Sequence, residues 1–218
     1  MLHFKRFVKK IFYHFGLEIK FVGKKNSYYQ RMFDRISEIN GDIVECGVGK
    51  MGSFQILASL LRNDSRARNI WGFDSFEGFP EPTAEDTSAR RPQKGEWKST
   101  AVEDVSKFLL ILGFKTQWIA SRVKVVKGFF KDTIPNTDVP KIALLHLDVD
   151  LYDSYKTCLH YLFPKVVKGG VVLFDEYENG SENIKFPGAK KAIDEYFEHT
   201  NHRLLRDRHS GKYFLVKS

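Results

Sequence analysis

Short apolar runs alternate with amphipathic stretches along most of the chain. Five runs rich in β-branched and apolar residues have the length of buried strands, and they cover residues 42–46, 69–74, 122–128, 141–148 and 170–176. Apolar residues at helical spacing predict helices near residues 26–38, 53–61, 101–113, 153–166 and 188–199. Strands that alternate with helices in this way predict an α/β fold with a mostly parallel, doubly wound sheet.

The two ends of the chain carry patterns of their own. Residues 202–207 and 212–217 are short apolar runs around the turn sequence RHSG, which predicts a C-terminal hairpin and an antiparallel edge to the sheet. Residues 1–16, MLHFKRFVKKIFYHFG, carry apolar residues at helical spacing with basic residues between them. Such a helix suits peripheral contact with an anionic membrane, or an arm packed on the domain or on a second subunit of a homo-oligomer. We favour the arm, which divides the chain into an N-terminal helical arm at residues 1–38 and one domain at residues 39–218.

One long segment breaks this rhythm. Residues 77–99 contain three prolines and many charged residues, and they show no period. A segment of this kind inside a compact domain is either disordered or a functional loop over a site. Because it leaves directly from a strand that ends in Asp74, we expect it to be a lid-like insertion over the site.

Composition narrows the class of protein without naming a function. The chain has 218 residues, of which 42% are hydrophobic and 28% are charged, as in a globular protein of one domain. The net charge of +8 is spread along the chain apart from an N-terminal cluster, so we do not expect a nucleic-acid partner. The two cysteines, Cys46 and Cys158, lie in apolar runs. They predict buried, reduced thiols in a cytoplasmic protein, with association at the inner face of a membrane as the alternative.

The first strand leads into a glycine-rich turn. Residues 41–53 read GDIVECGVGKMGS and contain the pattern G-x-G-x-x-G of dinucleotide-binding turns. Asp74, at the end of the second strand, suits the ribose hydroxyls of either a nicotinamide dinucleotide or S-adenosylmethionine. Glu45 separates these ligands, because a carboxylate beside the turn disfavours a pyrophosphate and suits the sulfonium and ammonium groups of S-adenosylmethionine.

Acidic residues gather after the fourth and fifth strands. The stretch HLDVDLYDS places His146, Asp148 and Asp150 on one face if the strand continues that far. The following strand ends in Asp175 and Glu176. These strand ends predict an oxygen-rich pocket of the kind that Mg²⁺ or another hard divalent cation prefers. We interpret His146 as a packing residue or as a neighbour of this pocket.

Six blocks of the chain, taken together, resemble the macrocin O-methyltransferase (TylF/MycF) family. They read DIVECGVGKMGS, WGFDSFEGFP, VVKGFFKDTIP, HLDVDLYDS, GGVVLFDEY and FPGAKKAIDEYF, in this order between about residues 41 and 200. The resemblance implies a Rossmann-like class I methyltransferase fold. It also implies an S-adenosylmethionine-dependent, divalent-metal-dependent enzyme that methylates a sugar hydroxyl of a nucleotide sugar, a glycan or a glycosylated natural product.

The resemblance implies roles for individual residues as well. The cofactor-binding residues would be Glu45, Gly47 and Ser53 at the methionine end, Asp74 at the ribose, and Gly128 and Phe129 at the adenine. Asp148, Asp175 and Glu176 would hold the metal ion, and Asp150 would be the general base. The chain departs from the family pattern at Glu176, where aspartate is more frequent, and at Lys50-Met51, where the family has arginine and glycine.

Two other classes of enzyme stay open at this point. The glycine pattern alone fits a nicotinamide dinucleotide-dependent oxidoreductase, but that function leaves the acids after the fourth and fifth strands without a role. A methyltransferase that acts on another small molecule or on nucleic acid fits the basic net charge. Against nucleic acid, the chain lacks aromatic residues interleaved with a basic stripe.

Overall fold

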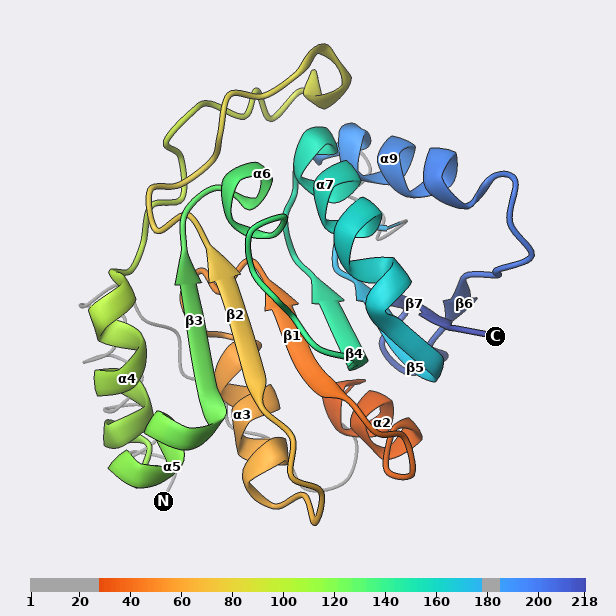
Figure 1. The fold of residues 1–218 in the computed structure, drawn as a ribbon. Coiled ribbons are helices and arrows are strands. Elements are labelled where there is room, and N and C mark those ends of the chain that lie inside the picture. Colours follow the sequence, from red (N-terminus) through yellow and green to blue (C-terminus); the bar gives the residue numbers. More distant parts are fainter. Residues whose placement is uncertain (1–27, 178–184) are drawn as a thin grey trace.

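A seven-stranded sheet with the order β3-β2-β1-β4-β5-β7-β6 forms the centre of the molecule (Figure 1). The computed structural model describes residues 28–177 and 185–218, so the helix expected at residues 1–16 lies outside the described residues. The strands are β1 Asp42–Cys46, β2 Ile70–Asp74, β3 Val123–Lys127, β4 Ile142–Leu147, β5 Val166–Phe174, β6 Leu205–Arg206 and β7 Tyr213–Val216. Strands β1 to β5 pair in parallel, whereas β7 is antiparallel to both β5 and β6. The predicted sheet and C-terminal hairpin are therefore confirmed.

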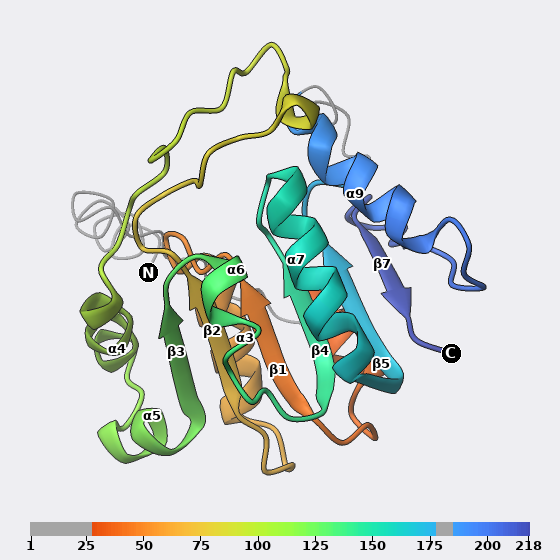
Figure 2. The same cartoon turned by 45° about the horizontal axis from the view of Figure 1, so that its top comes forward.

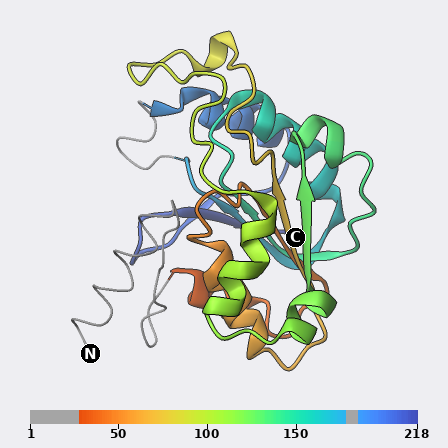
Figure 3. The ribbon, with the colours of Figure 1, turned by 90° about the vertical axis from the view of Figure 1, so that its left-hand side faces the viewer.

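Helices cover both faces of the sheet (Figure 2, Figure 3). They are α2 Tyr28–Arg35, α3 Phe54–Arg62, α4 Val102–Ile111, α5 Thr116–Arg122, α6 Phe130–Thr133, α7 Tyr152–Leu162 and α9 Pro187–Phe197. One hydrophobic cluster joins α2, α3, α4 and α5 to one face, and a second joins α7 and α9 to the other. Successive side chains of β1 point to opposite faces of the sheet, so Ile43 belongs to the first cluster and Val44 to the second. Among the helices that the structure describes, none has the length and apolar character needed to cross a bilayer.

Two features of the helices differ from the prediction. Helix α7 ends at Leu162 and not near residue 166, because Pro164 lies in a short 3₁₀ turn, Phe163–Lys165, and lacks a backbone N–H. Strand β5 then begins at once, at Val166. The sequence pattern does not predict α5 and α6, because seven and four residues are too few to show a helical period.

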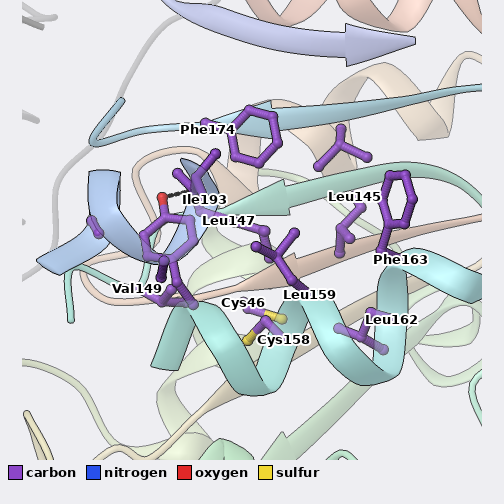
Figure 4. Close-up of a cluster of buried hydrophobic side chains, with 14 of the residues drawn as sticks. Cys46, Leu145, Leu147, Val149, Cys158, Leu159, Leu162, Phe163, Phe174 and Ile193 are labelled. Carbon is purple, nitrogen blue, oxygen red and sulfur yellow. Dashed lines mark hydrogen bonds between the residues drawn. The ribbon is translucent and has the colours of Figure 1, made fainter. Parts of the chain in front are cut away.

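The second hydrophobic cluster contains both cysteines (Figure 4). Cys46 ends β1 and Cys158 lies on α7, and both are fully buried free thiols, as predicted. Burial raises the pKa of the Cys46 thiol well above its ordinary value, so this side chain behaves as a small apolar group. The two side chains pack α7 against the sheet next to the carboxyl ends of β1 and β4.

Residues 77–99 form a long excursion from the end of β2 (Figure 1). The excursion crosses the carboxyl edge of the sheet toward α9 and contains the 3₁₀ turn η1 Ala84–Asp86. Its outward and return arms pair at the base, where the Phe79 N–H donates to the Glu96 carbonyl at 2.9 Å and the Gly95 N–H donates to the Phe79 carbonyl at 2.9 Å. The segment therefore has a defined conformation above the strand ends.

Helix α2 is part of the packed domain. Its residues Tyr28, Met32 and Phe33 are buried in the same cluster as α3. The Tyr28 hydroxyl also donates to the carbonyl of Tyr213 on β7 at 3.1 Å. The predicted boundary between an arm and the domain near residue 38 stays a prediction, since the first part of that arm lies outside the described residues.

Candidate functional site

A cavity of about 720 Å³ opens at the carboxyl edge of the sheet, between the strand ends and the insertion at residues 77–99. This volume is in the range of small-molecule binding sites. Seven of the predicted site residues line the cavity, and they are Gly47, Ser53, Asp74, Phe129, Asp148, Asp150 and Asp175. Glu45, Gly128 and Glu176 do not line it directly. The fold thus brings residues from the ends of β1, β2, β4 and β5 around one space.

The first glycine of the turn is required by packing of the backbone. Gly47 has a φ of +90°, and a Cβ atom on it would lie 1.8 Å from the carbonyl oxygen of Asp148. Gly49 has a φ of +48°, but no atom lies within 4 Å of the position of its Cβ. Gly47 is therefore needed for the close approach of the β1 and β4 ends, whereas Gly49 is needed only for its conformation.

The turn also holds a non-glycine residue in a left-handed conformation. Met51 has a φ of 64° and is fully buried in the cluster that contains α3. At this position the sequence pattern of the macrocin O-methyltransferase family, which the chain resembles, has glycine. The buried thioether gains apolar contacts that offset part of the backbone strain.

Glu45 lies beneath the turn and is completely buried. Its Oε1 atom accepts a hydrogen bond from the Ser53 hydroxyl and lies 2.9 Å from His146 Nδ1. Its Oε2 atom has no hydrogen-bond partner among the described residues. An unsatisfied buried carboxylate oxygen is costly, so Oε2 of Glu45 is an acceptor that a further hydrogen-bond donor would stabilise.

Asp74 ends β2 with its carboxylate held by the backbone on both sides. Its Oδ2 accepts the Gly49 N–H at 2.8 Å, and its Oδ1 accepts the Phe76 N–H at 2.7 Å. The Gly128 N–H donates to the Asp74 carbonyl at 2.9 Å, which brings the following residue, Phe129, to the cavity wall. The carboxylate is therefore preorganised at the cavity, and each oxygen keeps a further lone pair for a ligand hydroxyl.

Four acids meet after β4 and β5, in two overlapping groups. The ligand atoms of Asp148, Asp150 and Glu176 lie within 4.8 Å of one another, and so do those of His146, Asp148 and Asp175. Strand β4 ends at Leu147, so alternation along the strand does not place Asp150. A φ of 59° at Asp150 instead turns the loop so that its side chain joins the cluster.

The acids of this cluster disfavour one another's charges. Burial, together with the negative charge of Asp175, raises the pKa of Asp148 to about 7. Burial, followed by the charges of Asp150 and Asp148, raises the pKa of Glu176 well above its usual range, although the Tyr155 hydroxyl donates a hydrogen bond to it. A cation between these carboxylates would relieve both effects. The donor set therefore fits a hard divalent ion.

Two cationic or titratable side chains contact the cluster from outside it. Lys212, in the turn before β7, donates to Asp175 and lines the cavity. Burial lowers the pKa of Lys212, but the hydrogen bond to Asp175 and the negative charges of Asp175, Asp148 and Glu176 together raise it by more, and the net pKa lies above the usual value. His146 lies between the two halves of the site, with Nδ1 at Glu45 and Nε2 4.0 Å from Asp175 Oδ1. Burial lowers the pKa of His146, but the hydrogen bond to Glu45 and the negative charges of Glu45, Asp148 and Asp175 together outweigh burial and give a net rise.

The insertion contacts the same site from above. Asp86 is buried, and its Oδ1 accepts the N–H of Tyr152, the first residue of α7, at 2.8 Å. Its Oδ2 accepts the N–H and the hydroxyl of Thr83 at 2.8 and 3.0 Å. Because Tyr152 follows Asp150 by two residues, the insertion is tied to the loop that carries the acids.

An aromatic group completes the contact between the insertion and α9. The rings of Phe79 and Trp97 lie 5.1 Å apart, and the Trp97 ring lies 5.6 Å from Phe186, which precedes α9. The guanidinium of Arg90 lies 4.5 Å from the centre of the Trp97 ring. Phe79 and Trp97 both line the cavity.

Sequence reasoning missed Lys212, Asp86 and Tyr155 as residues of this region. Each lies outside the motifs that the sequence offers, and each reaches its acidic or backbone partner only through the fold. The proline- and charge-rich composition of residues 77–99 pointed to the insertion, but it contained no signal for Asp86 in particular. For Lys212, no pattern in the hairpin sequence distinguishes it from the other basic residues nearby.

Comparisons with known proteins agree with this picture. The sequence model of the macrocin O-methyltransferase (TylF) family matches residues 22–203. The chain is 34% identical over 162 residues to demethyldecarbamoylnovobiocin O-methyltransferase of Streptomyces niveus, covering 73% of this chain and 59% of that protein. It is 33% identical over 144 residues to 8-demethyl-8-(2,3-dimethoxy-alpha-L-rhamnosyl)-tetracenomycin-C 4'-O-methyltransferase of Streptomyces olivaceus, covering 64% and 54% of the two chains.

A solved structure supports the fold. The O-methyltransferase NovP superposes with a TM-score of 0.73 and 26% identity, over 87% of this chain and 77% of that chain. The predicted class I methyltransferase fold is therefore confirmed. The chain spans little more than half the length of the two relatives named above, 59% and 54%.

Proposed function

Because the chain belongs to the macrocin O-methyltransferase (TylF) family, we propose that it is an S-adenosylmethionine-dependent O-methyltransferase that methylates a sugar hydroxyl. The observation that carries the proposal is a single cavity lined both by Asp74, beside the glycine turn, and by Asp148, Asp150 and Asp175. The second relative is named as a 4'-O-methyltransferase of a rhamnosyl compound, which supports a sugar of a glycosylated small molecule as the acceptor.

The cofactor would occupy the side of the cavity formed by β1 and β2. The Asp74 carboxylate would accept hydrogen bonds from the ribose hydroxyls, and Phe129 would lie against the adenine. Gly47 and Ser53 would line the methionine end, with Glu45 beneath them as a source of negative charge. S-adenosylmethionine supplies the methyl group as part of a sulfonium cation.

The acceptor would occupy the side formed by β4, β5 and the insertion. Asp148, Asp175 and Glu176 would hold a divalent cation, with Asp148 common to both groups of ligand atoms. The cation would lower the pKa of a bound sugar hydroxyl. Asp150 would accept the proton of that hydroxyl as the general base. The oxygen would form a bond to the methyl carbon while the carbon–sulfur bond breaks, which leaves S-adenosylhomocysteine and a methyl ether. The insertion would limit the access of water to the sulfonium.

Binding of the cofactor is the first test of this proposal. We expect S-adenosylmethionine to raise the thermal unfolding midpoint, and NADH to leave it unchanged. Asp74→Asn should weaken S-adenosylmethionine binding about tenfold or more in calorimetry, because it removes a charged acceptor. Asp132→Asn, an exposed carboxylate on α6, is the matched control and should bind like the wild type. A midpoint that responds to NADH and not to S-adenosylmethionine would overturn the proposal in favour of the oxidoreductase.

The role of Asp150 needs a separate experiment, because its carboxylate is also within reach of a cation. We expect Asp150→Asn to retain Mn²⁺ binding and to lose methyl transfer by about 10²-fold or more. Transfer from radiolabelled S-adenosylmethionine is measured with methyl α-L-rhamnoside and a nucleotide-activated rhamnose as acceptors. Loss of Mn²⁺ binding in this variant would make Asp150 a metal ligand and not the base.

Nucleic acid is a less well supported candidate for the methyl acceptor than a sugar. The cationic residues are spread over the sequence, and the cavity wall contains Asp74, Asp148, Asp150 and Asp175, which repel phosphates. Incubation of the protein with labelled cofactor and total RNA is therefore expected to transfer no label. Labelled RNA would contradict the assignment of a sugar acceptor.

A further inference from the structure

Lys212 is the part of the acidic site that neither the motifs nor the family match covers. The match ends at residue 203, and Lys212 lies in the turn between β6 and β7. Its Nζ nevertheless reaches the end of β5, where it pairs with Asp175, and it forms part of the cavity wall. The C-terminal hairpin therefore inserts a positive charge into a group of acids on neighbouring strand ends.

The hairpin turn that carries Lys212 is held firmly. The Asp207 N–H donates to the Lys212 carbonyl, and the Gly211 N–H donates to the Asp207 carbonyl, both at 2.8 Å. The Asp207 carboxylate accepts hydrogen bonds from Arg31 of α2 at 3.0 and 2.5 Å. It also accepts the N–H and the hydroxyl of Ser210 at 2.8 and 2.7 Å. Because both strands of the turn are tied in this way, the Lys212 side chain starts from a defined position beside the acids.

The ammonium group and a divalent cation require the same oxygens. Asp175, which pairs with Lys212, has ligand atoms within 4.8 Å of those of Asp148, and Asp148 in turn belongs to the group with Asp150 and Glu176. A protonated lysine has no lone pair with which to ligate a metal. The ammonium group beside Asp175 repels a divalent cation bound to the same carboxylates, and in a partly buried site solvent and salt screen that repulsion only weakly.

We propose that Lys212 is a built-in counter-cation of the acidic site, which neutralises Asp175 when no metal is bound and competes with the divalent cation for that carboxylate. The inference rests on the metal site of the proposed function. Lys212 thereby stabilises the metal-free protein and lowers its affinity for the metal. Metal binding requires the ammonium group to leave Asp175, and the cavity on which Lys212 borders gives it a place to move.

Binding of Mn²⁺, measured by electron paramagnetic resonance of the free ion, tests this inference without an acceptor or methyl transfer. Lys212→Met removes the charge and keeps an unbranched side chain, and we expect it to bind Mn²⁺ about tenfold more tightly than the wild type. Lys212→Gln is a second uncharged variant with the same expectation. Lys212→Arg keeps the charge and should bind within about threefold of the wild type. Lys124→Met, on exposed strand β3 at the opposite edge of the sheet, is the control and should not differ from the wild type.

The thermal unfolding midpoint gives an independent readout. Without metal, Lys212→Met should unfold at a lower temperature than the wild type, because the acids lose their counter-charge. With saturating Mn²⁺, its midpoint should rise by more than that of the wild type. A merely structural lysine would lower the midpoint equally in both conditions.

The outcomes separate the two proposals. If neither the wild type nor the uncharged variants bind Mn²⁺, the metal site of the proposed function is wrong, and the role of Lys212 falls with it. If the wild type binds Mn²⁺ and the uncharged variants bind it equally or more weakly, the metal site stands and Lys212 is no competitor. If both uncharged variants bind Mn²⁺ more tightly than the wild type, and Lys212→Arg does not, the result supports the metal site and the competition by Lys212.

Discussion

The two walls of the cavity are built by different means. The lower wall consists of strand ends, in which Asp74 is the last residue of β2, and Gly47 and Asp148 directly follow β1 and β4. The upper wall consists of the insertion, in which Phe79 and Trp97 are held by side-chain contacts to α9 and by the short pairing at its base. The lower wall is therefore supported by the whole core, and the upper wall by a few contacts that can be removed one at a time.

This difference predicts where the molecule tolerates change. Strand ends carry the groups that must keep their geometry relative to a cofactor, because the sheet transmits any displacement to its neighbours. An irregular segment with few buried apolar contacts can open locally without unfolding the domain. We therefore expect substitutions in the lower wall to lower the free energy of unfolding of the domain most, and substitutions in the upper wall to lower it less and to act mainly on the insertion.

The largest effect is expected at Gly47. Gly47→Ala places a Cβ against the Asp148 carbonyl and adds strain at a φ of +90°, so it should lower the free energy of unfolding by about 3 kcal/mol or more. Gly49→Ala is the matched control, since it meets no neighbouring atom and should cost about 1 kcal/mol. Urea unfolding measures both. Equal losses would show that the conformation of the turn, and not the contact between β1 and β4, determines the need for glycine.

A smaller effect is expected at Asp86. Asp86→Ala leaves the N–H of Tyr152 and the N–H of Thr83 without their buried acceptor, which should cost about 2 kcal/mol. Limited proteolysis should show faster cleavage within residues 77–99, with the rest of the domain intact. Glu85→Ala, in the same turn, removes a partly exposed carboxylate that pairs with Lys191 at 3.3 Å, and it should leave cleavage of the insertion as slow as in the wild type. If the protease cleaves residues 77–99 of Asp86→Ala no faster than those of the wild type, the contacts of Asp86 do not hold the insertion in place, and the proposed difference between the two walls is wrong.

The smallest effect on stability is expected at Trp97. Its side chain is 56% exposed, and the contact between Phe79 and Phe186 at 6.1 Å does not depend on it. Trp97→Ala should therefore cost about 1 kcal/mol, from the ring contacts and the contact with Arg90. Trp97→Phe should recover part of this loss. A loss above about 2 kcal/mol in urea unfolding would place Trp97 with the lower wall in energetic terms.

The predicted and the observed elements show what local patterns carry. The run at residues 42–46 predicts β1 with its observed bounds, since an apolar run of five residues before a glycine turn is a complete local signal. The acids at Asp148, Asp175 and Glu176 follow from the rule that parallel strands end at one edge. The helix predicted at residues 153–166 ends at Leu162, because Pro164 lies in the 3₁₀ turn that follows it. A hydrophobic period gives the existence of a helix but not its last turn.

Periodicity and motif order by themselves thus determined the sheet, its antiparallel edge and the acids at its carboxyl ends, because these properties depend on residues that are neighbours in the chain. Only the tertiary structure decided the partners of those acids. Lys212 meets Asp175 from 37 residues away, and Asp86 meets Tyr152 from 66 residues away. Such contacts depend on how separate elements pack, and packing leaves no periodic signal in either segment. The same holds for Asp150, whose place in the cluster comes from one left-handed residue after the strand has ended.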